Sequence, residues 1–136
     1  MKVIVDPGCF LPERAYSSDA GYDLLSPVKR IVRVGEAVTI DTGVHVQIPN
    51  GYVGMIKSKS GLNVKHGLTS EGVIDSGYTG SIRVKLYNHG SWSYMIEIGD
   101  KIRQLVILPI ITPELELVTE FEPTDRGENG FGSTGR

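Results

Sequence analysis

The sequence predicts a single-domain, all-β protein, either a sandwich or a barrel, from three observations. Roughly ten short segments are rich in β-branched or alternating apolar residues, and Gly, Pro, Asn and Asp separate them. A helical pattern is confined to residues 58–67. The 136 residues, of which 40% are hydrophobic, suffice for one modest core.

The N-terminal part of the chain is predicted to form strands joined by tight turns. Alternating and β-branched residues predict strands at Lys2–Val5, Arg30–Val34, Ala37–Ile40, Val44–Ile48 and Tyr52–Lys57. Asp23 stands near Gly21 among small and apolar neighbours, and it is either a turn cap or a ligand contact. His45 alternates with Val44 and Val46, so we expect it on the solvent side and not as a ligand.

Residues 58–67 are expected to form the helix. Ser60 is placed as its N-cap, and Gly67 can end it in a left-handed conformation. A serine hydroxyl, free backbone N–H groups, Gly61 and the cation of Lys59 would together attract phosphate oxygens. The alternative is a capped connector without a ligand, because every helix has such an end.

Residues 71–87 are predicted to form a hairpin. Val73 and Ile74 end one strand, and the returning strand, Ser81–Tyr87, places alternate apolar side chains on one face. Asp75 and Tyr78 lie three residues apart around the bend, so a ligand there could meet a general base and a flat ring together. An Asx-type turn with a packing tyrosine is the alternative.

The C-terminal part of the chain is predicted to form the last strands, which end before residue 123. Strands are predicted at Tyr94–Ile98, Gln104–Ile111 and Leu115–Val118. Gln104 could bind polar atoms of a ligand or satisfy neighbouring backbone groups. The rings of Trp92 and Tyr94 are expected to pack against the body of the protein.

Residues 123–136 are predicted to be a flexible, Gly-rich arm. Arginines, hydroxyl groups and the aromatic ring of Phe131 suit it to closing over a phosphorylated ligand with a stackable base. The segment lacks the lysine that an ordinary phosphate loop requires. The alternative is a disordered terminus.

Composition argues against several classes of partner. The net charge is −2 and no run of Lys or Arg marks a basic patch, so neither nucleic acid nor a membrane is an expected partner. Cys9 is the only cysteine, which allows no intrachain disulfide and suits the cytoplasm. We expect no signal peptide and no membrane span.

The candidate residues are too dispersed to converge within one small barrel, so we expect subunits to share a site. Five motifs in order make nearly the whole chain resemble the trimeric dUTP pyrophosphatases, the dUTPase family. The motifs are Ala20-Gly21-Tyr22-Asp23-Leu24, Lys59-Ser60-Gly61-Leu62, residues 72–80 (GVIDSGYTG), residues 99–105 (GDKIRQL) and residues 126–135 (RGENGFGSTG).

The resemblance implies a fold, a reaction and an assembly. The fold would be a distorted jelly-roll or β-barrel with one short helix over residues 1–122, followed by a flexible arm over residues 123–136. The reaction would be hydrolysis of dUTP to dUMP and pyrophosphate, with Mg²⁺ held by the triphosphate. The assembly would be a homotrimer with three shared active sites.

The resemblance also assigns roles to individual residues. Asp75 would orient and deprotonate the water that attacks the α-phosphorus. Tyr78 would pack against the deoxyribose and exclude a 2′-hydroxyl, and Asp23 would hold Mg²⁺ through water. The remaining substrate-binding positions would be Lys59, Ser60, Gly61 and Gln104 for the phosphates, the backbone of Gly72 and Ile74 for uracil, and Arg126, Phe131, Gly132, Ser133 and Thr134 of the arm.

The sequence departs from the family pattern in three places. Lys59 stands where the family usually has arginine, and lysine offers a point charge in place of a two-pronged fork. Residues 66–71 form a shorter approach to the hairpin than usual, so the side chain that would contact uracil there is not assigned. Gly77 replaces an acid often found before the tyrosine, which is similar to the related dCTP deaminases.

Three rival functions follow from these observations. A dCTP deaminase would need a glutamate on the strand after the hairpin, where our alignment places Lys85, and lysine cannot replace that base. A nucleotide-responsive regulatory protein would use the same site to control a protein partner. A structural jelly-roll subunit would explain the strands but would leave the Gly-rich arm without a purpose.

Overall fold

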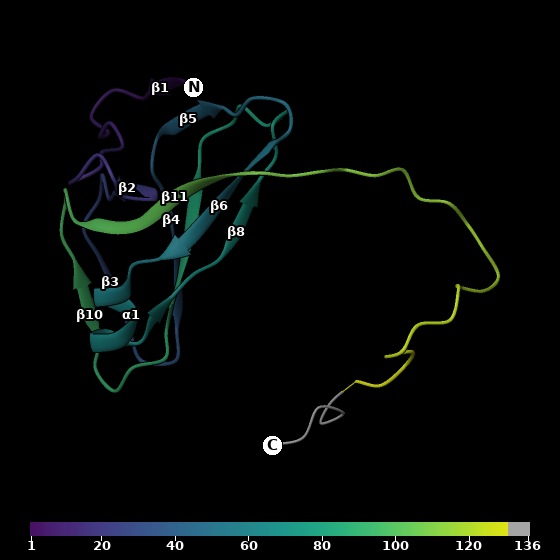
Figure 1. The fold of residues 1–136 in the computed structure, drawn as a ribbon. Coiled ribbons are helices and arrows are strands. Elements are labelled where there is room, and N and C mark those ends of the chain that lie inside the picture. The colour runs from purple at the N-terminus through teal and green to yellow at the C-terminus, as the bar shows by residue number, and fades with distance from the viewer. Residues whose placement is uncertain (131–136) are drawn as a thin grey trace.

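The computed structural model describes residues 1–130, and this part of the chain folds into eleven strands and one helix (Figure 1). The elements are β1 (Lys2–Val5), β2 (Gly21–Leu25), β3 (Arg30–Val32), β4 (Ala37–Asp41), β5 (Val44–Gln47), β6 (Tyr52–Ser58), α1 (Ser60–His66), β7 (Leu68–Thr69), β8 (Gly72–Ile74), β9 (Arg83–Asn88), β10 (Tyr94–Ile96) and β11 (Lys101–Pro109).

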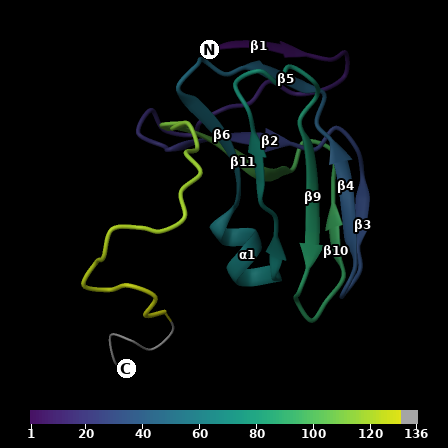
Figure 2. The same ribbon diagram turned by 90° about the vertical axis from the view of Figure 1, so that its right-hand side faces the viewer.

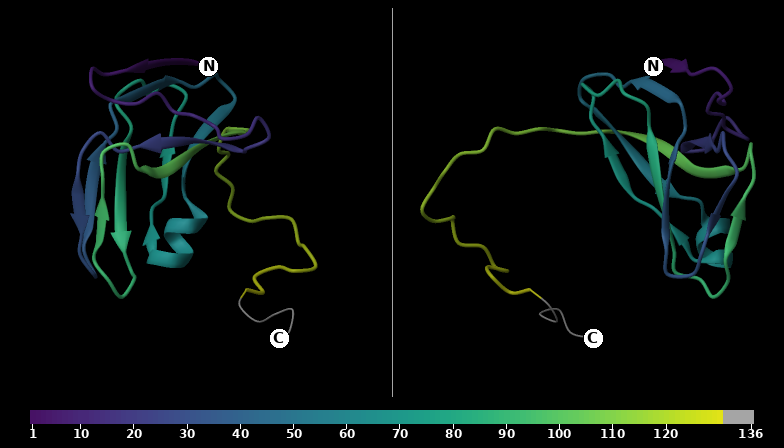
Figure 3. Two further views of the ribbon diagram at one scale, coloured as in Figure 1. Left: turned by 90° about the vertical axis from the view of Figure 1, so that its left-hand side faces the viewer. Right: turned by 180° about the vertical axis from the view of Figure 1, so that it is seen from behind.

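The strands form small antiparallel sheets. A four-stranded sheet has the order β2-β11-β6-β8, a three-stranded sheet has the order β4-β9-β7, and β1-β5 and β10-β3 form pairs. Figures 2 and 3 show β3, β4, β9 and β10 side by side on one side of the molecule. The all-β prediction with one short helix is confirmed, and within residues 1–130 the sheets are arranged as in a jelly roll, without a closed barrel.

One hydrophobic core lies between the sheets. Most strands contribute the residues of one face, as β9 shows: Val84 and Leu86 are buried while Arg83, Lys85 and Tyr87 are exposed. The core residues are Leu24, Val32, Ile40, Val44, Val46, Ile48, Ile56, Leu68, Ile82, Val84, Leu86, Ile96, Ile102 and Leu105. No helix within residues 1–130 has the length and apolar character needed to cross a membrane.

The prediction that residues 71–87 form a hairpin is wrong, because its two strands do not pair with each other. β8 pairs with β6, whereas β9 pairs with β4 and β7, so the segment between them crosses from one sheet to the other. The positions of the two strands and the buried face of Ile82, Val84 and Leu86 are as predicted. Hydrophobic pattern locates a strand, but it does not select the strand's partner.

The strand β2 was not predicted, because the polar Asp23 interrupts its apolar pattern. Its backbone pairs with β11, and Asp23 is itself buried. The opposite error occurs at Leu115–Val118, where no strand forms. Leu115 and Leu117 are almost fully exposed there, since no other described strand lies beside them to complete a ladder.

Two local predictions near α1 differ from the structure. Lys59, not Ser60, is the N-cap residue, and Ser60 begins the helix without a side-chain capping bond. Gly67 does end the helix in the left-handed conformation, with φ of 66°, and its N–H donates to the carbonyl of Asn63. Trp92 is 85% exposed and does not pack as expected, whereas the ring of Tyr94 packs against the core.

Candidate active site

The segment between β8 and β9 presents the predicted acid and ring together. Asp75 follows β8 directly, and the N–H of Tyr78 donates to its carbonyl at 3.0 Å, which closes a tight turn. The Tyr78 hydroxyl donates to the carbonyl of Ser81 at 3.0 Å, so the ring lies folded over Gly80. Asp75 is exposed and Tyr78 is half-exposed at a cavity of about 220 Å³.

The end of this segment is anchored to the β4–β5 turn. Ile82 exchanges backbone hydrogen bonds with Thr42 and Val44. The carboxylate of Asp41 accepts hydrogen bonds from the Ser81 hydroxyl and the N–H of Gly43, and Arg83 pairs with it at 3.2 Å. The Ser81 hydroxyl is the largest cause that lowers the pKa of Asp41, so this carboxylate is ionised at neutral pH.

A second group of site residues lies where β2, β11 and the end of β6 meet. The buried carboxylate of Asp23 pairs with the ammonium group of Lys59 and, at 3.3 Å, with that of Lys101. Lys101 also pairs with Glu13 at 2.8 Å, and Glu13, followed by Asp23, raises the pKa of Lys101. Two cations and two carboxylates therefore form one nearly neutral network.

Gln104 joins this second group. It lies opposite Asp23 in the β2–β11 ladder, and its side-chain amide donates to the carbonyl of Ser58 at 3.3 Å. Its side chain also fills the space that a Cβ on Gly21 would need, because that atom would lie 2.8 Å from the Gln104 Oε1. Any side chain at this position would have to displace the Gln104 side chain from its present place.

The two groups stand far apart within one chain. Ile74 pairs with Gly54 on β6, whereas Lys59 follows the far end of that strand. At about 3.3 Å per residue, Asp75 and Lys59 are separated by roughly 20 Å along the strand. One chain consequently does not bring the acid of the turn beside the cation at the helix.

The structure describes residues 123–130 of the predicted arm. In the described part, the Arg126 guanidinium donates to the carbonyl of Asn129 at 3.1 Å, and the N–H of Gly127 donates to the Thr124 hydroxyl. The predicted arm contacts of Phe131, Gly132, Ser133 and Thr134 lie outside the described residues.

Candidate metal ligands are few. Residues 1–130 contain no group of three or more His, Cys, Asp or Glu side chains arranged to hold a metal ion. Asp23 offers carboxylate oxygen, the donor that Mg²⁺ prefers, and Mg²⁺ is commonly held by one or two carboxylates together with substrate phosphates. The donor chemistry of Asp23 therefore fits an ion that arrives with a triphosphate.

Sequence reasoning missed Glu13, His45 and Lys101 as residues that support the site. Glu13 reaches Asp23 through an isolated strand bridge from a loop ten residues away, which leaves no periodic signal. Lys101 lies before the strand predicted at Gln104–Ile111, although β11 in fact begins at Lys101. His45 points away from the core as expected, but its side chain is largely covered and bonds to Thr79 and Asp6.

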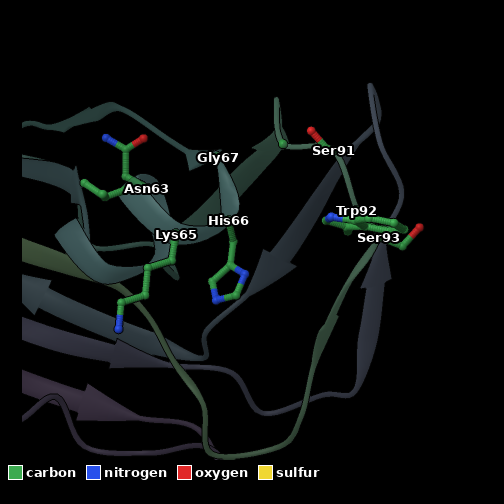
Figure 4. Close-up of a pocket in the computed structure, with 9 residues that line it drawn as sticks. Asn63, Lys65, His66, Gly67, Ser91, Trp92 and Ser93 are labelled. Atoms are coloured by element: carbon green, nitrogen blue, oxygen red, sulfur yellow. The ribbon is translucent and has the colours of Figure 1, made fainter.

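A separate cavity of about 380 Å³ lies between the C-terminal end of α1 and the β9–β10 loop, and none of the predicted site residues lines it (Figure 4). His66 contacts the ring of Tyr94 there at 4.7 Å between centroids, and Trp92 projects from the loop. The close approach of Gly67 to Gly90 holds the helix against the loop.

The fold and these side chains define a class: a small all-β enzyme that combines an acid-bearing turn with a second group of lysines and carboxylates joined by ion pairs. The chain belongs to the dUTPase family, whose model matches residues 9–135. It is 40% identical over 134 residues to the deoxyuridine 5′-triphosphate nucleotidohydrolase of Clostridium acetobutylicum, covering 96% of this chain and 92% of that protein.

Solved dUTPase structures have the same fold. The dUTPase of Staphylococcus bacteriophage 80alpha with dUpNHpp, one of the phage dUTPases described as controlling transfer of virulence genes, matches with a TM-score of 0.92 and 37% identity, over 99% of this chain and 98% of that one. A mutant dUTPase from phage phi11 of S. aureus, described as revealing the coordination of a structural Mg(II) ion, matches with a TM-score of 0.81 and 34% identity over 88% and 97% of the two chains.

Proposed function

We propose that this protein is a dUTP diphosphatase, which hydrolyses dUTP to dUMP and pyrophosphate. The observation that carries the proposal is the turn of residues 75–78, which exposes a carboxylate beside a fixed tyrosine ring in a chain of the dUTPase family. The reaction would limit the uracil available to DNA synthesis and supply dUMP for dTMP. A chain with one cysteine suits this work in the cytoplasm.

Asp75 acts as the general base in this proposal. Its carboxylate is exposed, so an attacking water can reach it, and an ionised oxygen can accept the water's proton as the water attacks the α-phosphorus. Tyr78 supplies selectivity, because a ring fixed through its hydroxyl to Ser81 cannot move aside for a 2′-hydroxyl. The backbone of Gly72 and Ile74, next to this turn, would bind the edge of uracil.

The phosphates would be bound by Lys59, Ser60, Gly61 and Gln104. Lys59 is already held near the other phosphate-binding groups by its ion pair with Asp23. A triphosphate that binds Lys59 would compete with that ion pair and free a carboxylate oxygen of Asp23. Lys101 remains beside Asp23 at 3.3 Å and keeps its carboxylate in place.

Mg²⁺ is the proposed cofactor, carried by the triphosphate. When bound, it would neutralise charge on the phosphate oxygens and so favour attack at phosphorus. Asp23 is the residue that would hold it, through water. The donor chemistry of Asp23 supports this assignment, as does the Mg(II) ion described for the related phage phi11 dUTPase.

A homotrimer with shared sites would reconcile the separated residues of one chain. The roughly 20 Å between Asp75 and Lys59 along β6 is too large for one chain to place both groups on one phosphate group, so a neighbouring copy would supply one of them. We propose that residues 123–136 form an arm that closes over such a site, with Arg126 on the phosphates and Phe131 over uracil.

The segment before the arm supports assembly. Within residues 111–122, the large apolar side chains at odd positions are almost wholly exposed, and glutamates stand at positions 114, 116, 120 and 122, which resembles a strand with one face covered; Val118 and Thr119 interrupt the alternation. Such a large exposed apolar face marks an interaction site. The exposed apolar residues are Ile111 (90%), Leu115 (98%), Leu117 (100%) and Phe121 (90%).

The rival reactions find less support. Lys85 lies on the exposed face of β9, with its ammonium group 5.1 Å from the centroid of the Tyr87 ring, and it cannot act as the glutamate of a deaminase. Control of virulence-gene transfer is described for phage dUTPases, and no observation on this chain carries that role over.

Product analysis tests the proposal. The purified chain would be incubated with dUTP, dCTP, dTTP or UTP and Mg²⁺, and the products separated by chromatography. We expect dUMP and pyrophosphate from dUTP alone, and a loss of about 10²–10⁴ in kcat for Asp75→Asn because the general base is removed. Glu36→Gln, an exposed acid paired with Arg33 on another turn, is the matched control and should behave as the wild type.

Two outcomes would contradict the proposal. Deamination of dCTP by the wild-type chain would reassign the reaction. Full activity of Asp75→Asn would remove Asp75 from the chemistry.

A further inference from the structure

A histidine outside the predicted site contacts the turn that carries Asp75 and Tyr78. The Nδ1 of His45, on β5, lies 2.9 Å from the carbonyl oxygen of Thr79, and its Nε2 lies 3.3 Å from the carboxylate of Asp6. The His45 side chain is 26% exposed, so the imidazole is largely covered by these neighbours. The ring therefore bridges the segment after β1 and the turn after β8.

The hydrogen bond from His45 differs from the other hydrogen bonds of the turn, because it connects the turn to another part of the protein. The hydrogen bonds of Tyr78 to Asp75 and to Ser81 are internal to the segment. Anchors to the β4–β5 turn begin only at Ser81 and Ile82. Among the hydrogen bonds and ion pairs of residues 1–130, the one from His45 is the one that joins residues 75–80 to the body of the protein.

The other end of the imidazole is also fixed. Asp6 donates its backbone N–H to the carbonyl of Gly43 at 2.8 Å, and its own carbonyl accepts from the N–H of Cys9. β1 and β5 pair along their whole length, with Ile4 opposite His45. The backbone that carries Asp6 and the strand that carries His45 are therefore both held in place, and the imidazole lies between the Asp6 carboxylate and the Thr79 carbonyl.

The charges around His45 favour its protonated form. The carbonyl of Thr79 is the largest cause that raises the pKa of His45, and the carboxylates of Asp6 and, more weakly, Asp41 act in the same direction. An imidazolium donates from both nitrogens, so it can satisfy Thr79 and Asp6 at once. Neutral imidazole has one N–H and can donate to only one of them.

We propose that His45 is a positioning residue for the reaction: by holding the carbonyl of Thr79, it fixes the turn on which Asp75 and Tyr78 stand. His45 does not touch the substrate and acts through the backbone of that turn. The inference rests on the proposed function for its kinetic consequences, but the contact itself can be tested without substrate.

The test compares His45→Ala, His45→Gln and a matched control, His89→Ala. His89 is exposed directly after the end of β9 and stacks on Tyr87, and it makes no hydrogen bond or ion pair with residues 75–80, so the same substitution there should leave the turn intact. Without substrate, we expect hydrogen exchange at the amides of residues 76–80 to be faster in His45→Ala and unchanged in His89→Ala.

The variant whose turn exchanges faster should also hydrolyse dUTP more slowly. Loss of one hydrogen bond that fixes a catalytic group is expected to lower kcat for dUTP by roughly threefold to tenfold in His45→Ala. KM should change less, and discrimination against UTP should weaken because Tyr78 is less firmly placed. His45→Gln should recover part of kcat, since its amide can donate to the Thr79 carbonyl.

The pH dependence separates positioning from a merely structural role. The advantage of the wild type over His45→Ala in kcat should be largest below the raised pKa of His45, where both nitrogens donate. It should shrink as pH rises through that pKa, because one of the two hydrogen bonds is then lost. The kcat of His89→Ala should equal that of the wild type at every pH.

The possible results distinguish the two proposals. Wild-type exchange at residues 76–80 together with wild-type kcat in His45→Ala would overturn the role of His45 while leaving dUTP hydrolysis intact. A wild-type chain that does not hydrolyse dUTP would overturn the proposed function, and the exchange experiment would still decide whether His45 holds the turn.

Discussion

Replacing Arg103 with methionine is predicted to stabilise the protein. Arg103 is fully buried, at 0% exposure, between Ile102 and Leu105 of β11. Its Nη1 donates to the carbonyl of Ile102 at 2.7 Å, but Nε and Nη2 have no hydrogen-bond partner among residues 1–130. A charge buried in this way costs free energy that an apolar side chain of similar length does not.

The size of the effect follows from the pKa of Arg103. Burial lowers this pKa by more than two units below the ordinary value of an arginine, to about 10. Since one pKa unit corresponds to about 1.4 kcal/mol, the buried charge costs roughly 3 kcal/mol at neutral pH. Losing the bond to Ile102 offsets about 1 kcal/mol of this, which leaves a net gain of roughly 2 kcal/mol for Arg103→Met.

Thermal unfolding at a fixed protein concentration would measure the gain. A domain of this size should show a rise in Tm of roughly 5–10 °C for 2 kcal/mol. Arg103→Lys keeps a buried charge and should show no such rise. The difference in Tm between the wild type and Arg103→Met should become smaller above about pH 10. There Arg103 loses its proton in the folded protein, so the folded state is no longer destabilised by a buried charge.

A lower Tm for Arg103→Met would refute this reasoning. It would mean that the guanidinium is well paired in the folded protein in solution, so that its removal leaves other groups unsatisfied.

Three further predictions concern the site and the fold. Lys59→Arg should lower the KM for dUTP severalfold with little change in kcat, because a guanidinium binds phosphate oxygens with two prongs; an unchanged KM would argue against phosphate contact. Gly67→Ala should lower stability by more than about 1 kcal/mol in denaturant titrations, since its φ is 66° and a Cβ would lie 2.5 Å from the backbone nitrogen of Gly90; equal midpoints would contradict the clash. Asp41→Asn should be less stable than the wild type at pH 7, and the two should converge as pH falls through the lowered pKa of Asp41, because the stabilising charge is then lost; a gap that persists at low pH would assign the effect to packing.

Local pattern predicted those features that depend on one segment. The alternation of Ile82, Val84 and Leu86 located a strand and its buried face, because side chains alternate in any strand whatever its partner. Gly67 marked a helix end because the left-handed conformation favours glycine. The spacing of Asp75 and Tyr78 likewise placed both on one tight turn.

Features that depend on a strand or side chain distant in the sequence could not be predicted from local pattern. The crossing from β8 to β9 was taken for a hairpin, because the choice of partner strand is decided by long-range packing. β2 was missed because Asp23 is buried through ion pairs with Lys59 and Lys101, which are distant in sequence. For the same reason the part played by His45 shows only when Thr79 is seen beside it.

Mixing two defective variants tests most directly whether dUTP is hydrolysed at sites shared between copies of the chain. Asp75→Asn and Lys59→Met would each be prepared as the sole subunit, shown to have little activity, then unfolded together in equal amounts and refolded. If Asp75 of one copy works with Lys59 of another, about a quarter of the sites in random trimers combine two intact residues, and dUTP hydrolysis should recover to about a quarter of the wild-type rate. Activity equal to the mean of the two parents would contradict the account, because it would place both residues of each site on the same chain.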